Sequence, residues 1–274
     1  MIEPTRNWGN GVGLGVIHIA ALAAFLPGMF HWSAVAAAAV VFYATSALGI
    51  ALCYHRTLTH RGLRLRKPLE YILATLGMLA MQGDPIRWVG THRKHHAHSD
   101  RPGDPHGRDR GFRWAHVRWL YARNADIPSD EELARYAPDL CASRYYRALR
   151  HLHWPLHLAL AALLFALGGW SWVIWAIFVR LVVSYHATWL VNSAAHSIGY
   201  RSYRTNDLST NCWWVALLAW GEGWHNNHHA FPYSARHGLR WFEIDPTWWS
   251  VKVLTLLRLA DRIRTPSRSA LGRA

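Results

Sequence analysis

The sequence predicts an all-α integral membrane protein, with four transmembrane helices in two hairpins and a helical cytoplasmic cap rich in histidine. Three observations lead to this fold class. Of the 274 residues, 51% are hydrophobic and 17 are Trp, a residue that favours the membrane interface. The longest apolar stretches occur in two pairs, and most of the 19 histidines and of the formal charge of +14 lie outside them.

The first predicted hairpin consists of Gly11–Phe30 and Ser33–Tyr54. Each stretch has about the 20 residues that cross the hydrocarbon core, and neither contains Lys, Arg, Asp or Glu. A second pair, Leu156–Leu167 with its flanks and Trp172–Leu190, is joined by the tight connector Gly168–Ser171. We therefore predict spans at about residues 11–30, 33–54, 154–169 and 172–191.

The predicted cap comprises residues 55–153 and 196–264, which carry most of the charge. The connectors Met29–Ser33 and Leu167–Trp172 contain no Lys or Arg, so the positive-inside rule places the cap and both termini in the cytoplasm. At this length we expect one domain, residues 1–264, followed by a disordered Ser/Arg-rich tail, residues 265–274.

Two further helices are expected outside the spans. Leu69–Met81 is apolar but short, and is interpreted as a helix that lies in the membrane or is buried beneath the cap. Trp248–Arg264 alternates apolar and basic residues, which suits an amphipathic helix on an anionic membrane surface or an ordinary cap helix packed on protein.

Composition also bears on the class of partner. Cys53, Cys141 and Cys212 are isolated, with neither a disulfide framework nor a zinc-ligand spacing, which suits a reducing compartment. No cleavable signal peptide is evident at the N-terminus. Basic residues interleaved with aromatics can bind nucleic acid, but the long apolar runs make that alternative remote.

Histidines gather in three short sequence boxes. HRTLTH contains His55 and His60, HRKHH begins at His92, and HNNHH begins at His225. Positions i, i+3 and i+4 share one face of a helix, so each HxxHH can aim three imidazoles at a common point. The five-residue spacing of HRTLTH shares a face less well, which suggests that this pair reaches inward from a helix end.

The boxes supply more imidazoles than one metal ion can bind while keeping a position open for substrate or oxygen, so two metal ions are the natural number. Imidazole ligands without thiolate suit Zn, Cu, Fe or Ni, and the spacing alone does not choose among them. The alternative, histidines that only line a basic juxtamembrane surface, requires two identical HxxHH triplets by accident.

The three boxes, together with NSAAH at Asn192–His196 and the run GEGWHNNHHAFPYSARHG, resemble the Δ9 fatty acyl desaturases. This membrane family includes stearoyl-CoA desaturases and the acyl-lipid desaturases of cyanobacteria and plastids. The likeness extends from about Cys53 to Trp249 and also covers GDPHGRDRGFRWAH and DLSTNCWW.

The resemblance implies a di-metal site of two iron ions held by nine histidines. Carried over motif by motif, with Asn192 reaching a metal through water, the ligands are His55, His60, His92, His95, His96, His196, His225, His228 and His229. His98 and His106 match no ligand position and are expected beside the site or on the surface. Asp104 either orients a ligand imidazole through its free ring N–H or is an ordinary loop residue.

The activity implied is an O2-dependent insertion of a cis double bond, at the Δ9 position, into a saturated acyl chain carried on a lipid or on CoA. Acyl-CoA enzymes of this family commonly carry an Arg two residues before the second box, where this chain has Gly90, and this favours a lipid-linked substrate. A separate electron donor, a ferredoxin or a cytochrome b5-like protein, is implied, as is a bacterial inner membrane.

Two alternatives to a desaturase stay open from the sequence. A hydroxylase or ketolase uses the same scaffold and adds oxygen to carbon instead of removing two hydrogens. A non-enzymatic haem-binding or metal-transporting protein would instead place its ligands within the spans.

Arg180 lies inside the fourth span, where a charge is costly, so we expect it to pair with a polar group or carbonyl beneath the site, or else to snorkel.

Overall fold

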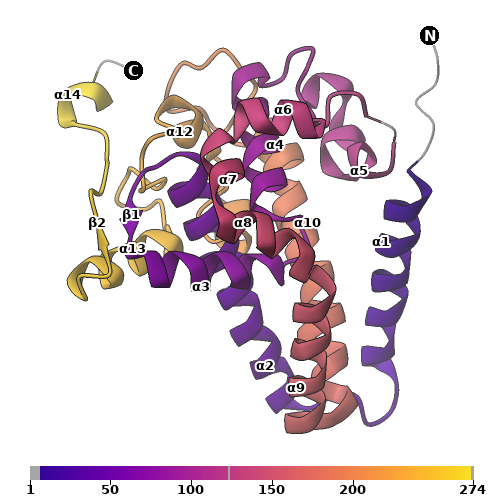
Figure 1. Ribbon diagram of the computed structural model, residues 1–274. Coiled ribbons are helices and arrows are strands. Elements are labelled where there is room, and N and C mark those ends of the chain that lie inside the picture. Colours follow the sequence, from indigo (N-terminus) through magenta and orange to yellow (C-terminus); the bar gives the residue numbers. More distant parts are fainter. Residues whose placement is uncertain (1–6, 123, 273–274) are drawn as a thin grey trace.

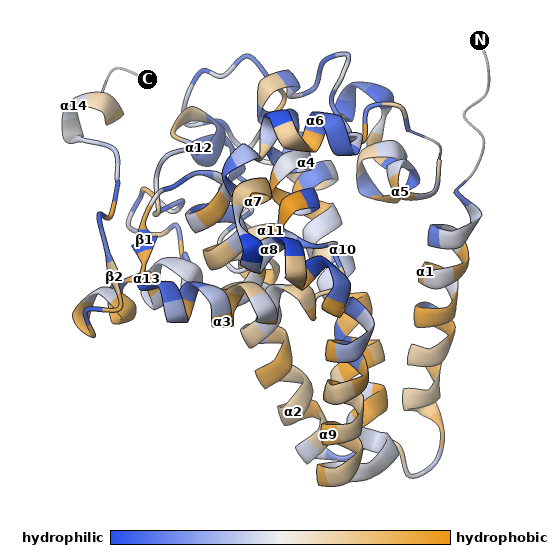
Figure 2. Cartoon of the chain, in the orientation of Figure 1, coloured by the Kyte–Doolittle hydropathy of each residue, from blue (hydrophilic) through white to orange (hydrophobic). Residues whose placement is uncertain are grey.

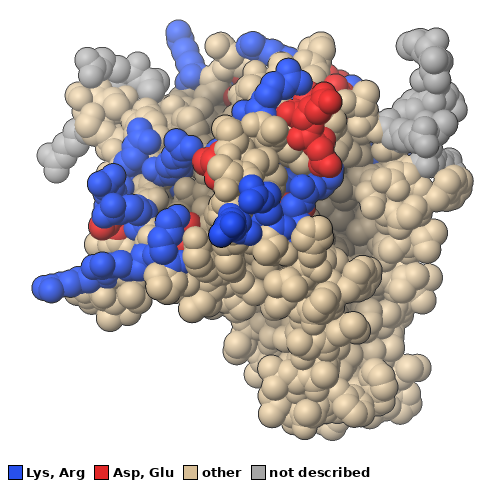
Figure 3. All heavy atoms as spheres, in the orientation of Figure 1, with Lys and Arg blue, Asp and Glu red and all other residues tan. Residues whose placement is uncertain are grey.

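The apolar helices form the lower part of the molecule, and a polar head lies above them (Figures 1 and 2). The computed structural model describes residues 7–122 and 124–272. Lys, Arg, Asp and Glu gather on the head, whereas the lower helices are bare of charge on the face shown (Figure 3). Within the described residues, three helices are long and apolar enough to cross a membrane: Trp8–Phe25, Trp32–Thr59 and Arg144–His196.

The first hairpin begins three residues earlier than predicted. Helix α1 (Trp8–Ala21) continues into the 3₁₀ turn η1 (Leu22–Phe25), and α2 (Trp32–Phe42) continues without a break into the π-helix η2 (Tyr43–Thr59). Apolar side chains on these helices face outward; Phe25 is 87% exposed. Such a surface is stable only in an apolar solvent, and we identify the chain as a membrane protein.

The third long helix reverses direction near its middle. Helix α9 (His153–Val173) is followed by the π-helical η6 (Ile174–Val179), α10 (Arg180–Ser193) and the 3₁₀ turn η7 (Ala194–His196). Inside α9 the backbone leaves helical geometry at Gly168 and at Gly169, whose φ of 63° favours glycine. The two arms then run side by side (Figure 1). The predicted Gly-Gly connector therefore coincides with the observed reversal.

Arg180 is buried at the start of α10. Its Nη1 donates to the carbonyl oxygen of Leu79 at 2.8 Å and its Nε to that of Ala176 at 3.0 Å. Leu79 caps the C-terminus of α3, where unpaired carbonyls carry partial negative charge. The expectation that Arg180 meets a carbonyl beneath the site is confirmed, and snorkelling is not observed.

The head is built from short helices around α4. Helix α3 (Lys67–Met78) fulfils the expectation of a helix at Leu69–Met81 and crosses above the spans, packed against η2 (Figure 1). Gly49 and Gly77 permit this approach, because a Cβ at Gly49 would lie 2.5 Å from the Gly77 nitrogen. The remaining helices of the head are α4 (Pro85–His98), η3 (Arg108–Arg110), η4 (Trp114–Arg118), α5 (Trp119–Tyr121), α6 (Asp130–Tyr136), α7 (Pro138–Ala142), α8 (Arg144–Leu149), η5 (Arg150–Leu152), α11 (Trp213–Leu218) and α12 (His225–Ala230).

The expected helix Trp248–Arg264 is too long. Helix α13 (Pro246–Leu256) ends early, and the backbone enters the left-handed region at Arg258 and Arg262. Between these positions β2 (Ala260–Asp261) pairs antiparallel with β1 (Arg64–Leu65), so tertiary pairing overrides the helical pattern. Within the tail predicted as disordered, α14 (Arg268–Leu271) is a short helix, and residues 273–274 lie outside the described residues.

Candidate metal centre

The nine predicted histidines lie in two adjacent groups inside the head. In each group the candidate ligand atoms all lie within 4.8 Å of one another. The five-histidine group consists of His55, His60, His92, His96 and His228. The four-histidine group consists of His95, His196, His225 and His229. Sequence segments more than 100 residues apart thus converge as the boxes predicted.

The HxxHH boxes do not each aim at one point, and that expectation is wrong. From α4, His92 and His96 enter the five-histidine group while His95 enters the other. Helix α12 divides its triplet in the opposite sense, with His228 alone in the five-histidine group. At about 100° per residue, positions i+3 and i+4 point in different directions around the axis, so one helix can serve two neighbouring sites.

His55 and His60 owe their common direction to the wide helix that carries them. Helix η2 ends at Thr59, and the backbone N–H of His60 donates to the His55 carbonyl at 3.1 Å, a bond between residues five apart. The Thr59 hydroxyl likewise donates a hydrogen bond to the carbonyl oxygen of Tyr54, five residues earlier, at 2.8 Å. In a π-helix residues five apart are neighbours, so the two rings face each other with centroids 4.9 Å apart.

The inward nitrogens are arranged as metal ligands would be. His228 Nε2 lies 3.1 Å from His55 Nε2 and 2.9 Å from His96 Nε2. In the other group His225 Nε2 and His229 Nε2 are 3.1 Å apart. His55 Nδ1 faces the Glu222 carboxylate and carries the single N–H of a neutral ring, so its Nε2 can only accept a hydrogen bond. His228 Nε2 would then have one N–H for two neighbours, so these contacts cannot both be ordinary hydrogen bonds.

Two of the inward nitrogens have no partner at all. Among the described residues, nothing hydrogen-bonds to the buried Nε2 of His60 or of His196. A buried polar atom without a partner is costly, and a bound cation in each group would satisfy it. The residues therefore fit two metal ions with imidazole ligands.

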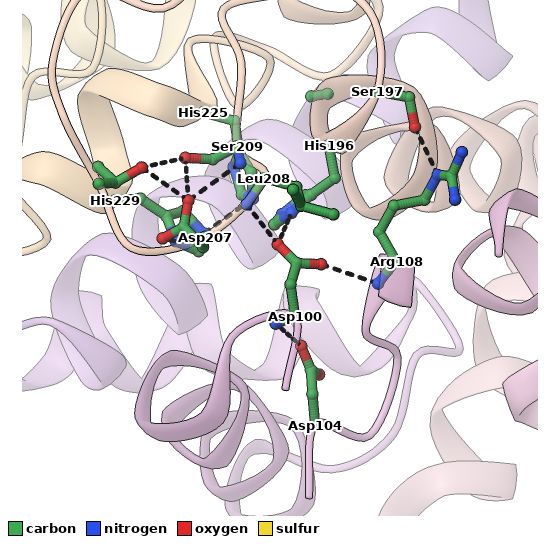
Figure 4. A network of polar contacts seen from close by, with 12 residues as sticks. Asp100, Asp104, Arg108, His196, Ser197, Asp207, Leu208, Ser209, His225 and His229 are labelled. Atoms are coloured by element: carbon green, nitrogen blue, oxygen red, sulfur yellow. Dashed lines mark hydrogen bonds and ion pairs between the residues drawn. The ribbon is translucent and has the colours of Figure 1, made fainter. Parts of the chain in front are cut away.

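Carboxylates hold the outer nitrogen of four of these rings, and Figure 4 shows two of the pairs, Asp100 with His196 and Asp207 with His229. Asp104 lies 2.9 Å from His95 Nδ1, which favours the orienting role over that of an ordinary loop residue. Sequence reasoning missed three others: Asp100 on His196 at 2.7 Å, Asp207 on His229 at 2.8 Å, and Glu222 on His55. A carboxylate on Nδ1 fixes the ring and leaves Nε2 free to bind metal. Three of these four acids serve the four-histidine group.

Electrostatics keep most of the rings neutral and the acids ionised. Burial, and then repulsion from neighbouring imidazoles, lowers the pKa of His60, His92 and His228 well below the usual value. Burial alone would raise the pKa of Asp100, but the hydrogen bond and charge of His196 outweigh it and lower that pKa to about 2. Neutral imidazole is the form that binds metal.

Arg56 supports the five-histidine group from behind. Its guanidinium is fully buried and donates to Asp245 at 2.9 and 3.0 Å, to Glu222 at 3.0 and 3.3 Å, and to the Ala235 carbonyl at 2.9 Å. Glu222 thus bridges Arg56 and the Nδ1 of His55. Arg56 stands inside the HRTLTH box, but no sequence pattern marked it as part of the site.

A narrow cavity of about 60 Å³ opens beside both groups. Asn192 lines this cavity together with His55, His92 and His225. Among the described residues it makes no direct hydrogen bond to these histidines, and it was predicted to reach a metal through water. The wall also includes the apolar or hydroxyl-bearing side chains of Phe42, Ser46, Ile50, Trp88, Thr188, Leu218 and Trp220. The candidate metal centre therefore adjoins a small, mainly apolar cavity.

The other histidines of the head surround the two groups. His106 is buried, with its ring centroid 4.3 Å from that of His95, and burial is the main cause that lowers its pKa to about 3. His98 lies 3.3 Å from the Tyr136 hydroxyl. Both positions agree with the expectation that they lie beside the site. His237, which sequence reasoning missed, has its ring tilted against that of His228, with the centroids 4.6 Å apart.

Comparison with known proteins places these features in a family context. The model of the fatty acid desaturase family matches residues 9–255. The chain is 50% identical over 262 residues to the sn-1 stearoyl-lipid 9-desaturase of Anabaena variabilis, covering 96% of this chain and 95% of that protein. It is 49% identical over 256 residues to the sn-1 stearoyl-lipid 9-desaturase of Synechocystis sp., covering 93% and 80%.

A relative with a different acyl carrier is also similar. The acyl-CoA C20 Delta5-desaturase of Anemone leveillei is 44% identical over 257 residues, covering 93% of this chain and 80% of that protein. The matches span the histidine boxes and both pairs of apolar helices.

Proposed function

The chain belongs to the fatty acid desaturase family and is a fatty acyl desaturase; on that premise we propose that it inserts a cis Δ9 double bond into a saturated acyl chain of a membrane lipid. The observation that carries the proposal is the pair of imidazole groups beside a narrow apolar cavity. A hydrocarbon substrate and a redox-active centre would meet there.

We propose that the nine histidines hold two iron ions, with Asn192 reaching one of them through water. Iron bound there would supply, with O2 and two electrons, the oxidising power to remove hydrogen from two adjacent methylenes, which no side chain can attack. The chain itself fixes the rings through Asp100, Asp104, Asp207 and Glu222. Burial of both groups keeps bulk water from the reacting carbons.

Hydrogen bonds that hold residues of the cavity wall would set the position of the double bond. Gln82 donates to the Thr188 hydroxyl at 3.0 Å and accepts from the Trp88 indole N–H at 3.3 Å. Deeper between the spans the Ser46 and Ser184 hydroxyls are 2.8 Å apart. These bridges favour one path for the chain, so that a fixed distance from the headgroup would select one pair of carbons.

The carrier is proposed to be a lipid. The two relatives of highest identity described above are named as acyl-lipid desaturases. Gly90, rather than Arg, stands two residues before the second box, and a Cβ at this position would press on Leu133, so a bulky cation has no room there. CoA is the alternative carrier, and a CoA relative is 44% identical.

We further propose a single membrane domain, residues 1–264, that crosses the bilayer four times. The reversal at Gly168–Gly169 supports two crossings by the helix Arg144–His196. The gathering of Lys and Arg on the head supports a cytoplasmic active site and cytoplasmic termini, in a bacterial inner membrane (Figure 3). O2 and a separate electron donor, a ferredoxin or cytochrome b5-like protein, complete the reaction.

Expression in a host without its own desaturase tests this function. Gas chromatography with double-bond location should find a new cis Δ9 acid in the lipid fraction. His228→Ala and His229→Ala should each abolish the product and remove about half of the bound metal, since each ring serves a different group. His151→Ala, an exposed histidine outside the site, is the matched control. A product heavier by one oxygen would indicate hydroxylation and refute desaturation.

A further inference from the structure

Two loops of the head meet directly over the four-histidine group (Figure 4). The first follows α4 and contains Asp100, and the second follows η7 and contains Leu208. Asp100 Oδ2 lies 2.7 Å from His196 Nδ1 and also accepts the Leu208 backbone N–H at 2.8 Å. Its other oxygen accepts the backbone N–H of Arg108 at 2.8 Å. A short chain of bonds therefore joins the Leu208 backbone to a candidate metal ligand.

The outer side of the same loops is apolar in places and otherwise basic. Leu208 is 46% exposed and Ile198 is 52% exposed. Arg101, Arg201 and Arg204 are exposed on these loops. Arg101 donates to the Asn206 carbonyl at 3.2 Å, and Arg201 to the Thr205 carbonyl at 2.9 Å, which ties both to the second loop.

These three arginines are free to meet a partner. In the described part of the chain, no carboxylate lies within 4.0 Å of the Arg101, Arg201 or Arg204 guanidinium. By contrast, Arg61 and Arg93 share Asp139, and Arg56 is held by two carboxylates. An apolar centre bordered by unpaired charges is the arrangement of a transient docking interface.

The five-histidine group has no comparable connection to this surface among the described residues. Its carboxylate, Glu222, lines the cavity between the spans and is shared with the fully buried Arg56. A soluble protein bound to these two loops therefore has a bonded connection to the four-histidine group through Asp100.

We propose that Arg101, Ile198, Arg201, Arg204 and Leu208, named here the loop face, dock an acidic, soluble one-electron carrier, and that electrons enter through Leu208, Asp100 and His196. The proposal rests on the proposed function, which needs an external reductant. Each reduced carrier would give up one electron and depart oxidised, and the acceptor would be an oxidised metal ion held by the four-histidine group. Two such steps supply one turnover.

The charge of the loop face selects the partner. The chain has a net charge of +14, and an acidic carrier would be drawn to the unpaired arginines over several ångströms of solvent. Complementary charge of this kind raises association rates by about 10–1,000-fold and loses its effect in salt. The exposed Leu208 and Ile198 would then exclude water from the centre of the contact.

The test uses the full-length, metal-loaded chain in lipid nanodiscs and a reduced plant-type [2Fe–2S] ferredoxin as the probe. Stopped-flow spectroscopy measures how fast the ferredoxin is oxidised, and surface plasmon resonance measures its binding, each at low and high salt. The paired change Arg101→Glu and Arg204→Glu should slow ferredoxin oxidation and weaken binding about tenfold or more at low salt. At high salt the variant and the unaltered chain should converge.

The control is the same charge change elsewhere. Arg144→Glu with Arg147→Glu on α8, two exposed arginines outside the loop face, should leave both measurements near their original values. Leu208→Asp keeps the backbone N–H and should weaken docking by disturbing the apolar centre. Reduction by dithionite, a small chemical reductant, should proceed at the original rate in all variants.

Three outcomes would overturn the proposal: no salt-sensitive binding of ferredoxin to the unaltered chain, equal rates in the Arg101/Arg204 variant, or an equal loss in the α8 control. Failure of the proposed function is a separate result. A dithionite-reduced chain given O2 and lipid that makes no double bond would refute desaturation, while the binding and oxidation measurements would still decide the docking surface.

Discussion

The buried Arg56 offers a sharp test of what holds the metal centre together. Arg56→Met would remove five hydrogen bonds, two to Asp245, two to Glu222 and one to Ala235, and leave two buried carboxylates without their counter-charge. Removing one partner of a buried ion pair costs about 3–5 kcal/mol. Asp245 keeps three backbone N–H donors, which places the expected loss toward the lower end.

A matched variant isolates burial as the cause. Arg64 makes an equally well-formed pair with Asp261, at 2.6 Å, but both side chains are about half exposed. Arg64→Met should therefore lower the stability far less than Arg56→Met does, because water screens an exposed ion pair. Thermal unfolding of the detergent-solubilised protein at one scan rate should show a fall of roughly 6–20 °C for the Arg56 variant. Metal content should fall as well, because Glu222 also orients His55.

The reasoning would be refuted if the Arg56→Met and Arg64→Met variants had the same melting temperature and the Arg56→Met variant kept its metal. That result would mean that solvent reaches Glu222 and Asp245 and screens them, so that the pair contributes as little as a surface pair does. Arg56→Lys, which retains the charge but not the forked donor geometry, should lie between the two.

Three further predictions concern packing, pH and metal. Gly49→Ala should push η2 away from α3 and lower the melting temperature, at a cost of about 1–3 kcal/mol in stability. Gly13→Ala is the control and should not destabilise the protein, because no atom lies within 4 Å of the new methyl group. Melting curves of the two variants test this prediction. Burial alone would raise the pKa of Asp139, but the hydrogen bonds from Arg93 and Arg61 outweigh burial and lower that pKa to about 2. Ionised Asp139 therefore stabilises the fold above about pH 3.8, and this stabilisation is lost as the pH falls toward 2. Asp139→Asn should therefore cost about 1 kcal/mol at pH 7, after screening, and the gap from the unaltered chain should close in acid; a constant gap would contradict the assignment. Chelation should lower the melting temperature of the unaltered chain and change it little once His228 and His229 are both Ala, as calorimetry with and without chelator can check.

The apolar spans could be predicted because length and lack of charge are local properties of the sequence. The connector at Gly168–Gly169 is also local, since the backbone there needs glycine. The histidine boxes contain eight of the nine rings in the two groups, and the resemblance at NSAAH added His196, because ligand type and spacing on a short helix survive folding.

What escaped prediction depends on long-range arrangement. Asp100 and Asp207 reach ligands 96 and 22 residues away, and nothing in their spacing marks them as partners. One sequence feature could have indicated two of these acids, because Asp100 and Glu222 each lie within a few residues of one of the last two boxes. The early end of α13 follows from the pairing of Asp261 with Arg64, which no local pattern contains.

The width of η2 has a consequence for how such centres are sought in sequences. In η2 the backbone hydrogen bonds join residues five apart, so His55 and His60 lie on the same face of the helix. In an ordinary α-helix their side chains would point in different directions. A search that accepts only separations of three or four would pass over this pair. Deleting one residue between them, which would look like a correction toward the commoner spacing, should instead swing His60 out of register with its four companions.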